Sequence, residues 1–137
     1  MDFELIDYSE FYYTKILRKE ISAKCNGKFV QITNEDTGKE YIVLSPRELS
    51  VHHANIVERF MLNRGKGTYN QKKDFFTIHN PEWVVVGGGI WTIDYPNKAL
   101  NLSGTSQGYG KFDSNGFKKK ILTIAKMIGF TIIIDGI

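Results

Sequence analysis

Short β-rich runs separated by turn signals follow one another from residue 28 onward, and this alternation restricts the possible folds more than any other feature. Residues 28–33 (KFVQIT) and 40–44 (EYIVL) are rich in β-branched and aromatic residues, and they flank the segment 34–38 (NEDTG). That arrangement predicts a β-hairpin. Further strands are predicted at about residues 74–79, 83–86, 91–94 and 99–103, with a turn at 95–98.

Two amphipathic stretches interrupt these strands and predict helices. The first is expected from about residue 46 or 47 to residue 63 or 64, and residues 65–67 (GKG) are expected to close it. The second is expected to begin at a cap on Asp113 or Ser114 and to end at Gly129. Apolar residues recur at helical spacing in both stretches: Leu49, Ile56, Val57 and Phe60 in the first, and Phe117, Ile121, Ile124, Ala125 and Ile128 in the second.

The two ends of the chain complete the predicted fold. Residues 130–134 (FTIII) form an apolar run, which is typical of a central strand covered on both faces. Residues 1–25 fit either a helix capped by Asp7 or Ser9 or a strand around the Tyr12–Tyr13 pair; the helix would run through Phe11, Ile16 and Leu17. The whole pattern predicts an α+β, sandwich-like fold with a mixed sheet of five or six strands and two main helices.

Length and composition indicate one globular domain spanning residues 1–137. Cys25 is the only cysteine, so an intramolecular disulfide is impossible and a secreted, disulfide-rich scaffold is not expected. Residues 1–4 (MDFE) do not resemble a signal peptide, and the apolar runs are too short to span a bilayer. We therefore expect a cytoplasmic, monomeric protein without a membrane partner.

The formal net charge of +3 favours anionic ligands over cationic ones. The sequence lacks the clustered basic residues of a dedicated nucleic-acid binder, so nucleic acid is not an expected partner. Residues 118–120 (KKK) are the only run of like charge, and such runs are usually solvated helix faces.

His53 lies in the middle of the apolar stripe of the first helix, whereas His52 lies at its border. A polar ring in that position must be hydrogen-bonded, ligand-bound or neutral, because burying it otherwise costs a few kcal/mol. A lone core histidine is more often structural than functional. The alternative is proton transfer or nucleophilic attack, for which a pKa near neutrality is suited.

Two glycine-containing segments leave similar alternatives. Gly87, Gly88 and Gly89 fit a tight hairpin or bulge, or a place where another group approaches the backbone closely. Residues 103–110 (SGTSQGYG) fit a flexible connector, or a loop whose backbone N–H groups bind an anion. Neither segment matches a Walker A loop or a dinucleotide fingerprint. His52, His53, His79 and Cys25 lack metal-ligand spacing, so neither a metal nor another cofactor is predicted.

These segments together resemble the Janus/Ocnus family, which includes the protein phosphohistidine phosphatases. Residues 53–56 (HANI) are similar to the family's His-Ala-Asp-Ile helix segment, and residues 87–89 to its triple glycine. Residues 105–110 (TSQGYG) resemble its Tyr-Ser-Met-Ala-Tyr-Gly loop. The resemblance implies a cofactor-free hydrolase that removes phosphate from phosphohistidine in a phosphorylated protein or peptide and releases inorganic phosphate.

The resemblance also implies residue roles. The histidine that matches His53 is the essential catalytic group, as base or as nucleophile. The positions matched to phosphate binding are Lys28, Ser106, Gln107 and the backbone amide of Gly108, and those expected to support the pocket are Gly87, Gly88, Gly89, Tyr109 and Gly110.

Three positions depart from the family pattern. Ile90 stands where the family has an arginine after the triple glycine, and Arg47 matches a second arginine only after a register shift. Ser114 corresponds roughly to a histidine at the pocket edge. Charged hydrogen bonds contribute about 1.5–3 kcal/mol each, so these losses weaken anion binding. They leave a second interpretation open, a non-catalytic module that binds phosphoprotein or another anion.

Overall fold

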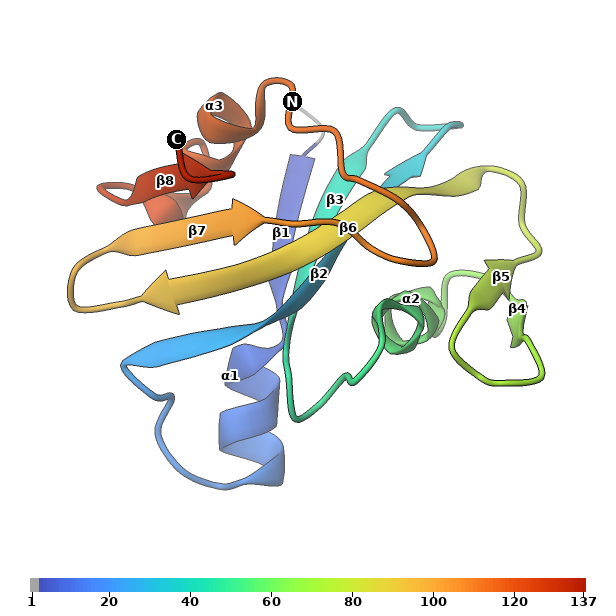
Figure 1. The fold of residues 1–137 in the computed structure, drawn as a ribbon, viewed down its shortest axis with the longest axis horizontal. Helices are drawn as coiled ribbons and strands as arrows, with labels where there is room; N and C mark the ends of the chain where they lie inside the picture. Colours follow the sequence, from blue (N-terminus) through green and yellow to red (C-terminus); the bar gives the residue numbers. More distant parts are fainter. Residues whose placement is uncertain (1–2) are drawn as a thin grey trace.

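The computed structural model describes residues 3–137, and its main element is a mixed sheet of six strands. These strands are β1 (Phe3–Asp7), β2 (Lys24–Asn34), β3 (Glu40–Pro46), β6 (Trp83–Asp94), β7 (Ala99–Ser103) and β8 (Thr131–Ile134). They lie in the order β1-β3-β2-β6-β7-β8 (Figure 1). The outer pairs β1–β3 and β7–β8 are parallel and the three inner pairs antiparallel. The predicted α+β fold with a mixed sheet is thereby confirmed.

A separate two-stranded sheet and several short helices surround the main sheet. The small sheet pairs β4 (Gly67–Tyr69) with β5 (Phe76–Ile78), and it lies beside helix α2 (Figure 1). The helices are α1 (Ser9–Phe11), which continues into the π-helical turn η1 (Tyr12–Ile16), α2 (His53–Met61), α3 (Phe117–Ile121) and the 3-10 turn η2 (Ala125–Met127). Within residues 3–137, no helix is long and apolar enough to cross a membrane.

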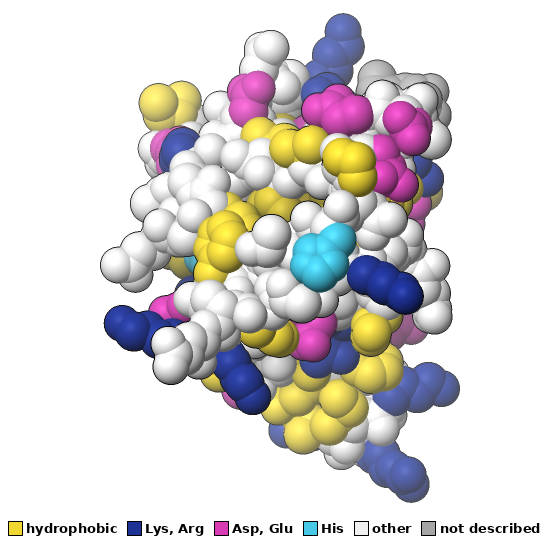
Figure 2. Space-filling model, turned by 90° about the vertical axis from the view of Figure 1, so that its right-hand side faces the viewer, with side chains coloured by type: hydrophobic (Ala, Val, Ile, Leu, Met, Phe, Trp, Pro, Cys, Tyr) yellow, Lys and Arg dark blue, Asp and Glu magenta, His cyan; other side chains and the backbone are white. Residues whose placement is uncertain are grey.

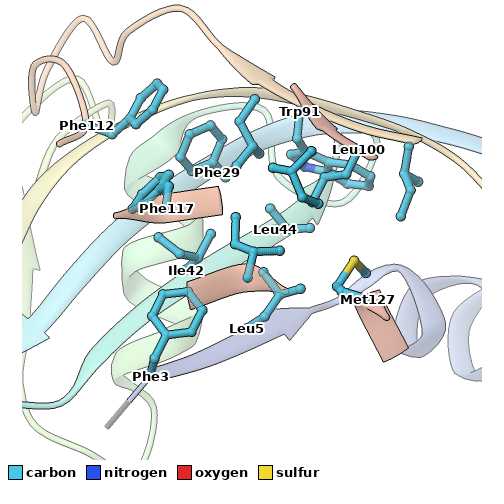
Figure 3. Packing of buried hydrophobic residues seen from close by; sticks show 14 of the residues in the cluster. Phe3, Leu5, Phe29, Ile42, Leu44, Trp91, Leu100, Phe112, Phe117 and Met127 are labelled. Atoms are coloured by element: carbon cyan, nitrogen blue, oxygen red, sulfur yellow. The ribbon is translucent and has the colours of Figure 1, made fainter. Parts of the chain in front are cut away.

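Hydrophobic clusters cover both faces of the sheet, because successive residues of a strand point to opposite faces. In β2, Phe29 packs into one cluster and Val30 into the other, and Ile42 and Val43 of β3 divide in the same way. Figure 3 shows the first cluster, which α3 and η2 complete with Phe117 and Met127. The apolar side of α2 and Phe76 of β5 cover the second cluster.

The predicted hairpin of β2 and β3 is confirmed, as is the turn between β6 and β7. At the tip of the hairpin, the side-chain oxygen of Asn34 accepts hydrogen bonds from the N–H groups of Asp36 and Thr37, at 3.0 and 3.1 Å. Gly38 then takes a φ of 75°, which glycine adopts without steric cost.

The strands predicted at 83–86 and 91–94 form one strand, β6, which runs straight through the triple glycine. Gly87, Gly88 and Gly89 pair with residues of β2, and the register shifts once, next to Gln31. The glycines therefore do not form a hairpin. The strand predicted at 74–79 is shorter in the structure, where it is β5, and it belongs to the small sheet and not to the main one.

The first helix starts and ends at residues other than those predicted. Buried Ser45 and Ser50 share a hydrogen bond of 2.7 Å, and the Leu49 and Ser50 N–H groups donate to the Pro46 carbonyl oxygen. These turns keep residues 47–52 out of the helix, which begins at His53. It ends at Met61, because Asn63 takes a left-handed φ of 69° before the predicted closure at residues 65–67.

The second helix is much shorter than predicted. Its N-cap is Gly116 rather than Asp113 or Ser114, and α3 ends at Ile121. The chain must reverse into β8 within a few residues, and Gly129 makes that reversal with a φ of 85°.

This early end changes which side chains enter the core. Ile124 already has an extended backbone, and the turn η2 buries Met127 instead of the predicted Ala125 and Ile128. Ile128 is 67% exposed.

The last strand is an edge strand, so its predicted central position is wrong. β8 pairs with β7 alone, and Ile132 is its only buried residue. An apolar run shows that a segment is covered but does not show whether it is paired on both sides.

The N-terminal segment follows the helix alternative, and the strand predicted around Tyr12–Tyr13 is wrong, because both residues lie in η1. The strand that forms, β1, lies earlier in the chain and was not predicted. The helical residues Ser9–Ile16 follow it, with the Asp7 carboxylate accepting a hydrogen bond of 2.8 Å from the Ser9 N–H group. The expected apolar side of this helix faces solvent, since Phe11, Ile16 and Leu17 are each about 40–50% exposed. Residues 1 and 2, the start of the predicted domain, lie outside the described residues.

Candidate functional site

A pocket of about 530 Å³ opens between the start of α2, the loop after β7 and the hairpin of β4 and β5. It brings together most of the residues that the sequence singled out. Its lining consists of Lys28 from β2, His52 and His53 from α2 and its cap, Asp74 and Phe75 from the hairpin, and Thr105, Ser106, Gln107, Gly108 and Tyr109 from the loop.

His53 is the first residue of α2, and the local sequence fixes its position. His52 before it is extended, with φ −115° and ψ 152°, and serves as the helix N-cap. The Asn55 side-chain oxygen accepts a hydrogen bond of 2.9 Å from the His52 N–H group, which ties down the entry to the helix. The His53 ring is half-buried, and its Nε2 atom lies 2.9 Å from the Gly89 carbonyl oxygen.

That contact determines the proton on the neutral ring. A carbonyl oxygen only accepts hydrogen bonds, so Nε2 must carry the proton and donate it to Gly89. In the neutral ring, Nδ1 then carries the lone pair, and Nδ1 has no hydrogen-bond partner among residues 3–137. Nδ1 of His53 is therefore the ring atom that is free for proton transfer or attack.

The triple glycine makes this placement of His53 possible. A Cβ atom on Gly88 would lie 2.8 Å from the ring atom Cδ2 of His53 and 2.6 Å from the Phe29 carbonyl oxygen. A Cβ atom on Gly87 would lie 2.4 Å from the Lys111 carbonyl oxygen. The close-approach interpretation of these glycines is thus the correct one: the missing side chains admit the ring on one side and the chain after the loop on the other.

The surroundings of His53 favour its neutral form. Burial is the main cause that lowers the pKa of His53 below its usual 6.5, and the charge of nearby Lys28 lowers it further. The hydrogen bond to Gly89 acts in the opposite direction. His53 is therefore an uncharged base at neutral pH.

The loop after β7 folds into a closed turn. Ser106 and Gly110 exchange backbone hydrogen bonds of 3.1 and 2.8 Å, and the Gly110 carbonyl oxygen also accepts one from the Gly88 N–H group. The buried Ser106 hydroxyl oxygen accepts a hydrogen bond of 3.0 Å from the Tyr109 N–H group. Within the described residues, the N–H groups of Gln107 and Gly108 have no protein acceptor, so they are free to bind an anion.

Lys28 places a positive charge at the same pocket. Its ammonium group donates a hydrogen bond to the Val51 carbonyl oxygen, which holds the side chain beside the start of α2. An ammonium group has three donors, so two remain for a ligand.

Tyr109 links the loop to the small sheet instead of facing a ligand with its hydroxyl group. The hydroxyl group donates to the Phe76 carbonyl oxygen at 2.6 Å and accepts from the Phe76 N–H group at 2.9 Å. Burial raises the pKa of Tyr109 to about 12, so the hydroxyl stays protonated. Tyr109 thus fixes the loop, in line with its predicted supporting position.

A sequence model of the Janus/Ocnus family matches residues 13–127. The chain belongs to the Janus/Ocnus family. A comparison with curated proteins gives no match. The motifs quoted above resemble the family over about residues 28–134. The family match begins further toward the N-terminus, includes the second half of the helical segment 9–16, and ends at residue 127.

The family's arginine and histidine positions can now be located in this Janus/Ocnus chain. Ile90 pairs with Lys28 across β2 and β6 and is 43% exposed, so an arginine there would lie next to Lys28. Arg47 donates instead to Asn26, and Ser114 lines a different cavity, near α3. Neither Arg47 nor Ser114 is part of the His53 pocket.

Sequence reasoning missed Asp74 and Phe75. They follow no motif, and their place in the pocket depends on how the small sheet docks, which a local pattern does not contain. The aromatic pair Phe75–Phe76 was the one visible signal that this segment packs against another element.

Figure 2 faces the side with α2 and the small sheet, where Lys and Arg side chains are separated from one another by uncharged and acidic ones. In the run 118–120, Lys120 pairs with Glu40 at 2.7 Å, and Lys118 donates to the Ile137 carbonyl oxygen at 3.0 Å. Among residues 3–137, no group of three or more His, Cys, Asp or Glu side chains is arranged to hold a metal ion.

Proposed function

We propose that this pocket binds a phosphoryl group and that the protein hydrolyses a P–N bond, with phosphohistidine in a protein or peptide as substrate and inorganic phosphate as product. The observation that carries the proposal is the shared pocket of neutral His53, the free N–H groups of Gln107 and Gly108, and the ammonium group of Lys28. Membership of the Janus/Ocnus family supports it.

The arrangement suits a tetrahedral anion. The two loop amides and Lys28 supply donors for the phosphoryl oxygens, and the Ser106 hydroxyl group can add another, because its hydrogen has no acceptor within the described residues. Phosphoryl transfer depends mainly on positioning and on stabilising the charge of the equatorial oxygens. These groups provide both without a metal.

His53 supplies the remaining chemical step through Nδ1. As a base, Nδ1 takes a proton from water; the water oxygen bonds to phosphorus, the P–N bond breaks, and the departing nitrogen keeps the electron pair and takes up a proton. As a nucleophile, Nδ1 itself bonds to phosphorus while the substrate P–N bond breaks, and the departing nitrogen keeps that electron pair and takes up a proton. Water then bonds to phosphorus, the new P–N bond breaks, and Nδ1 regains its lone pair as inorganic phosphate leaves. A neutral ring is required in both routes, and burial of His53 provides it.

One observation favours a second function, a non-catalytic module that binds phosphoprotein or another anion. Ile90 stands beside Lys28 where the family has an arginine, so this pocket has one positive side chain fewer to stabilise a developing charge. Binding an anion requires less charge stabilisation than hydrolysis does, and the loop amides alone can hold an anion.

Turnover of a phosphohistidine peptide by the wild type and by His53→Ala separates the two functions. Hydrolysis predicts a loss of about 10²–10⁴-fold in rate with an unchanged melting temperature. His79→Ala is the matched control, because His79 is exposed and lies outside the pocket, and it should keep full activity.

A wild type that fails to hydrolyse the peptide would refute the proposed reaction. Phosphate-induced NMR shifts confined to His53 and residues 106–110, in the absence of turnover, would then establish the binding module.

A further inference from the structure

The pocket is larger than a phosphoryl group requires, and its additional wall comes from the β4–β5 hairpin. Its volume of about 530 Å³ falls within the roughly 300–1,000 Å³ typical of sites for whole small molecules. Asp74 and Phe75 form the wall, whereas the donors for an anion lie on β2 and the loop. The wall therefore faces whatever the phosphoryl group is attached to.

The hairpin wall is held firmly against the anion-binding loop. Phe75 stacks on Tyr109 with ring centroids 4.5 Å apart and an angle of 22° between the planes. A Cβ atom on Gly108 would lie 3.0 Å from the Phe75 ring, so this ring packs closely against the loop at Gly108. Together with the two hydrogen bonds between Tyr109 and Phe76, these contacts fix the distance between wall and loop.

Asp74 presents a carboxylate with one oxygen to spare. The Asn70 side-chain N–H donates to Oδ1 of Asp74 at 2.7 Å, and the Asn70 side-chain oxygen accepts from the backbone N–H groups of Asp74 and Phe75 at 3.0 Å each. Oδ2 of Asp74 has no partner among residues 3–137. The exposed Lys72 and Lys73 at the same tip do not line the pocket.

A carboxylate in this position opposes the binding of an anion, so it needs another explanation. A substrate that joins a phosphoryl group to a positively charged side chain would satisfy both sides of the pocket. The phosphoryl oxygens would meet Lys28 and the loop amides, and the cation would meet Asp74. The face of an aromatic ring such as Phe75 also attracts cations.

We propose that Asp74 and Phe75 form a subsite for the side chain that carries the phosphoryl group, and that this subsite selects basic nitrogen-containing rings such as imidazole over neutral phenyl rings. The subsite deepens the proposed function and rests on it for the placement of the phosphoryl group. During P–N cleavage the ring receives the electron pair of the broken bond, and Asp74 would hold the proton on the other ring nitrogen, so that the ring departs as neutral imidazole and not as an anion.

Binding measurements test the subsite without any need for turnover. The probes are imidazolylmethylphosphonate, benzylphosphonate and inorganic phosphate, titrated by calorimetry at low salt and at a pH where the imidazole ring is charged. The wild type should bind the imidazole compound about fivefold more tightly than the benzyl compound, the factor for one charge pair about 4 Å apart in water.

Variants identify the groups responsible. Asp74→Asn should bring the ratio of the two affinities close to one and leave phosphate binding equal or slightly tighter. Asp36→Asn, an exposed carboxylate at the tip of the β2–β3 hairpin, is the matched control and should keep the wild-type ratio. Phe75→Leu should weaken both ring compounds more than it weakens phosphate.

Equal binding of both phosphonates by the wild type, or an unchanged ratio in Asp74→Asn, would overturn the subsite. A protein that shows the ratio but cannot hydrolyse phosphohistidine would contradict the proposed reaction and leave the subsite standing. A protein that binds none of the three probes would refute both.

Discussion

Gly88→Ala tests the central packing contact of the site, the close approach of the His53 ring to strand β6. The new Cβ atom would lie 2.8 Å from Cδ2 of His53 and 2.6 Å from the Phe29 carbonyl oxygen, whereas ordinary contacts are 3.4 Å or longer. The ring can yield by rotating, but the Phe29 carbonyl belongs to the neighbouring strand β2 and is fixed by pairing on both sides.

The expected destabilisation follows from these contacts. Overpacking a core by one carbon costs about 1–3 kcal/mol, and a backbone neighbour places Gly88→Ala at the upper end of that range. For a chain of this size, about 3 kcal/mol lowers the melting temperature by roughly 10 °C. Rotation of the ring would also break the hydrogen bond from Nε2 of His53 to Gly89.

Thermal unfolding followed by circular dichroism measures the stability, and NMR of the imidazole C–H groups reports on the ring. Gly38→Ala is the control: it has open space around its Cβ atom but a φ of 75°, so it should cost about 1–2 kcal/mol and leave the His53 signals unchanged. Wild-type stability and unshifted His53 signals in Gly88→Ala would show that the ring does not rest on β6.

Two more predictions concern His53 and Trp91 of the first hydrophobic cluster. The NMR titration of His53 should give a pKa below 6.5 that rises when phosphate is added, and a pKa above 6.5 would contradict the burial argument. As the pH falls, the unfolded chain takes up this proton before the folded one does. The contribution of His53 to stability is therefore complete above pH 6.5 and is lost as the pH falls through the folded pKa. Trp91→Phe should lower the free energy of unfolding by about 1–3 kcal/mol in denaturant titrations, because the buried indole N–H donates to the carbonyl oxygens of Lys28 and Ser45 at 3.0 and 3.1 Å. An unchanged free energy of unfolding would mean that water replaces this donor.

The sequence predicted best those elements whose signals are local. The β2–β3 hairpin has β-rich arms and an Asn-to-Gly turn within one short segment, and the structure contains it as expected. For the site, the sequence alone offered a polar ring on an apolar stripe, His53, and a loop that fits an anion site, residues 103–110, each beside a purely structural alternative. The roles of His53 and Ser106 came from the resemblance to the Janus/Ocnus family, and both residues line the pocket.

Long-range packing explains most of the errors. Residues 47–52 have helical periodicity, but hydrogen bonds to Ser45 and Pro46 hold them in turns. The stripe of the second helix continues to Ile128, yet the need to reach β8 ends α3 at Ile121. The apolar run in β8 forms an edge strand of the sheet, next to β7 alone. Asp74 lines the pocket only because the small sheet docks on Tyr109. Only the first of these outcomes depends on residues nearby in the sequence; the others depend on how distant segments pack together.

The protonation state of His53 is the strongest physical argument for hydrolysis over simple anion binding. A site that only holds phosphate gains most from charged donors, and a neutral imidazole presents a lone pair on Nδ1 that repels phosphoryl oxygens. Here the ring is desolvated, its Nε2 proton is committed to Gly89, and Lys28 nearby disfavours a second proton. Each of these features weakens His53 as an anion-binding group, and each preserves the lone pair that a base or a nucleophile needs.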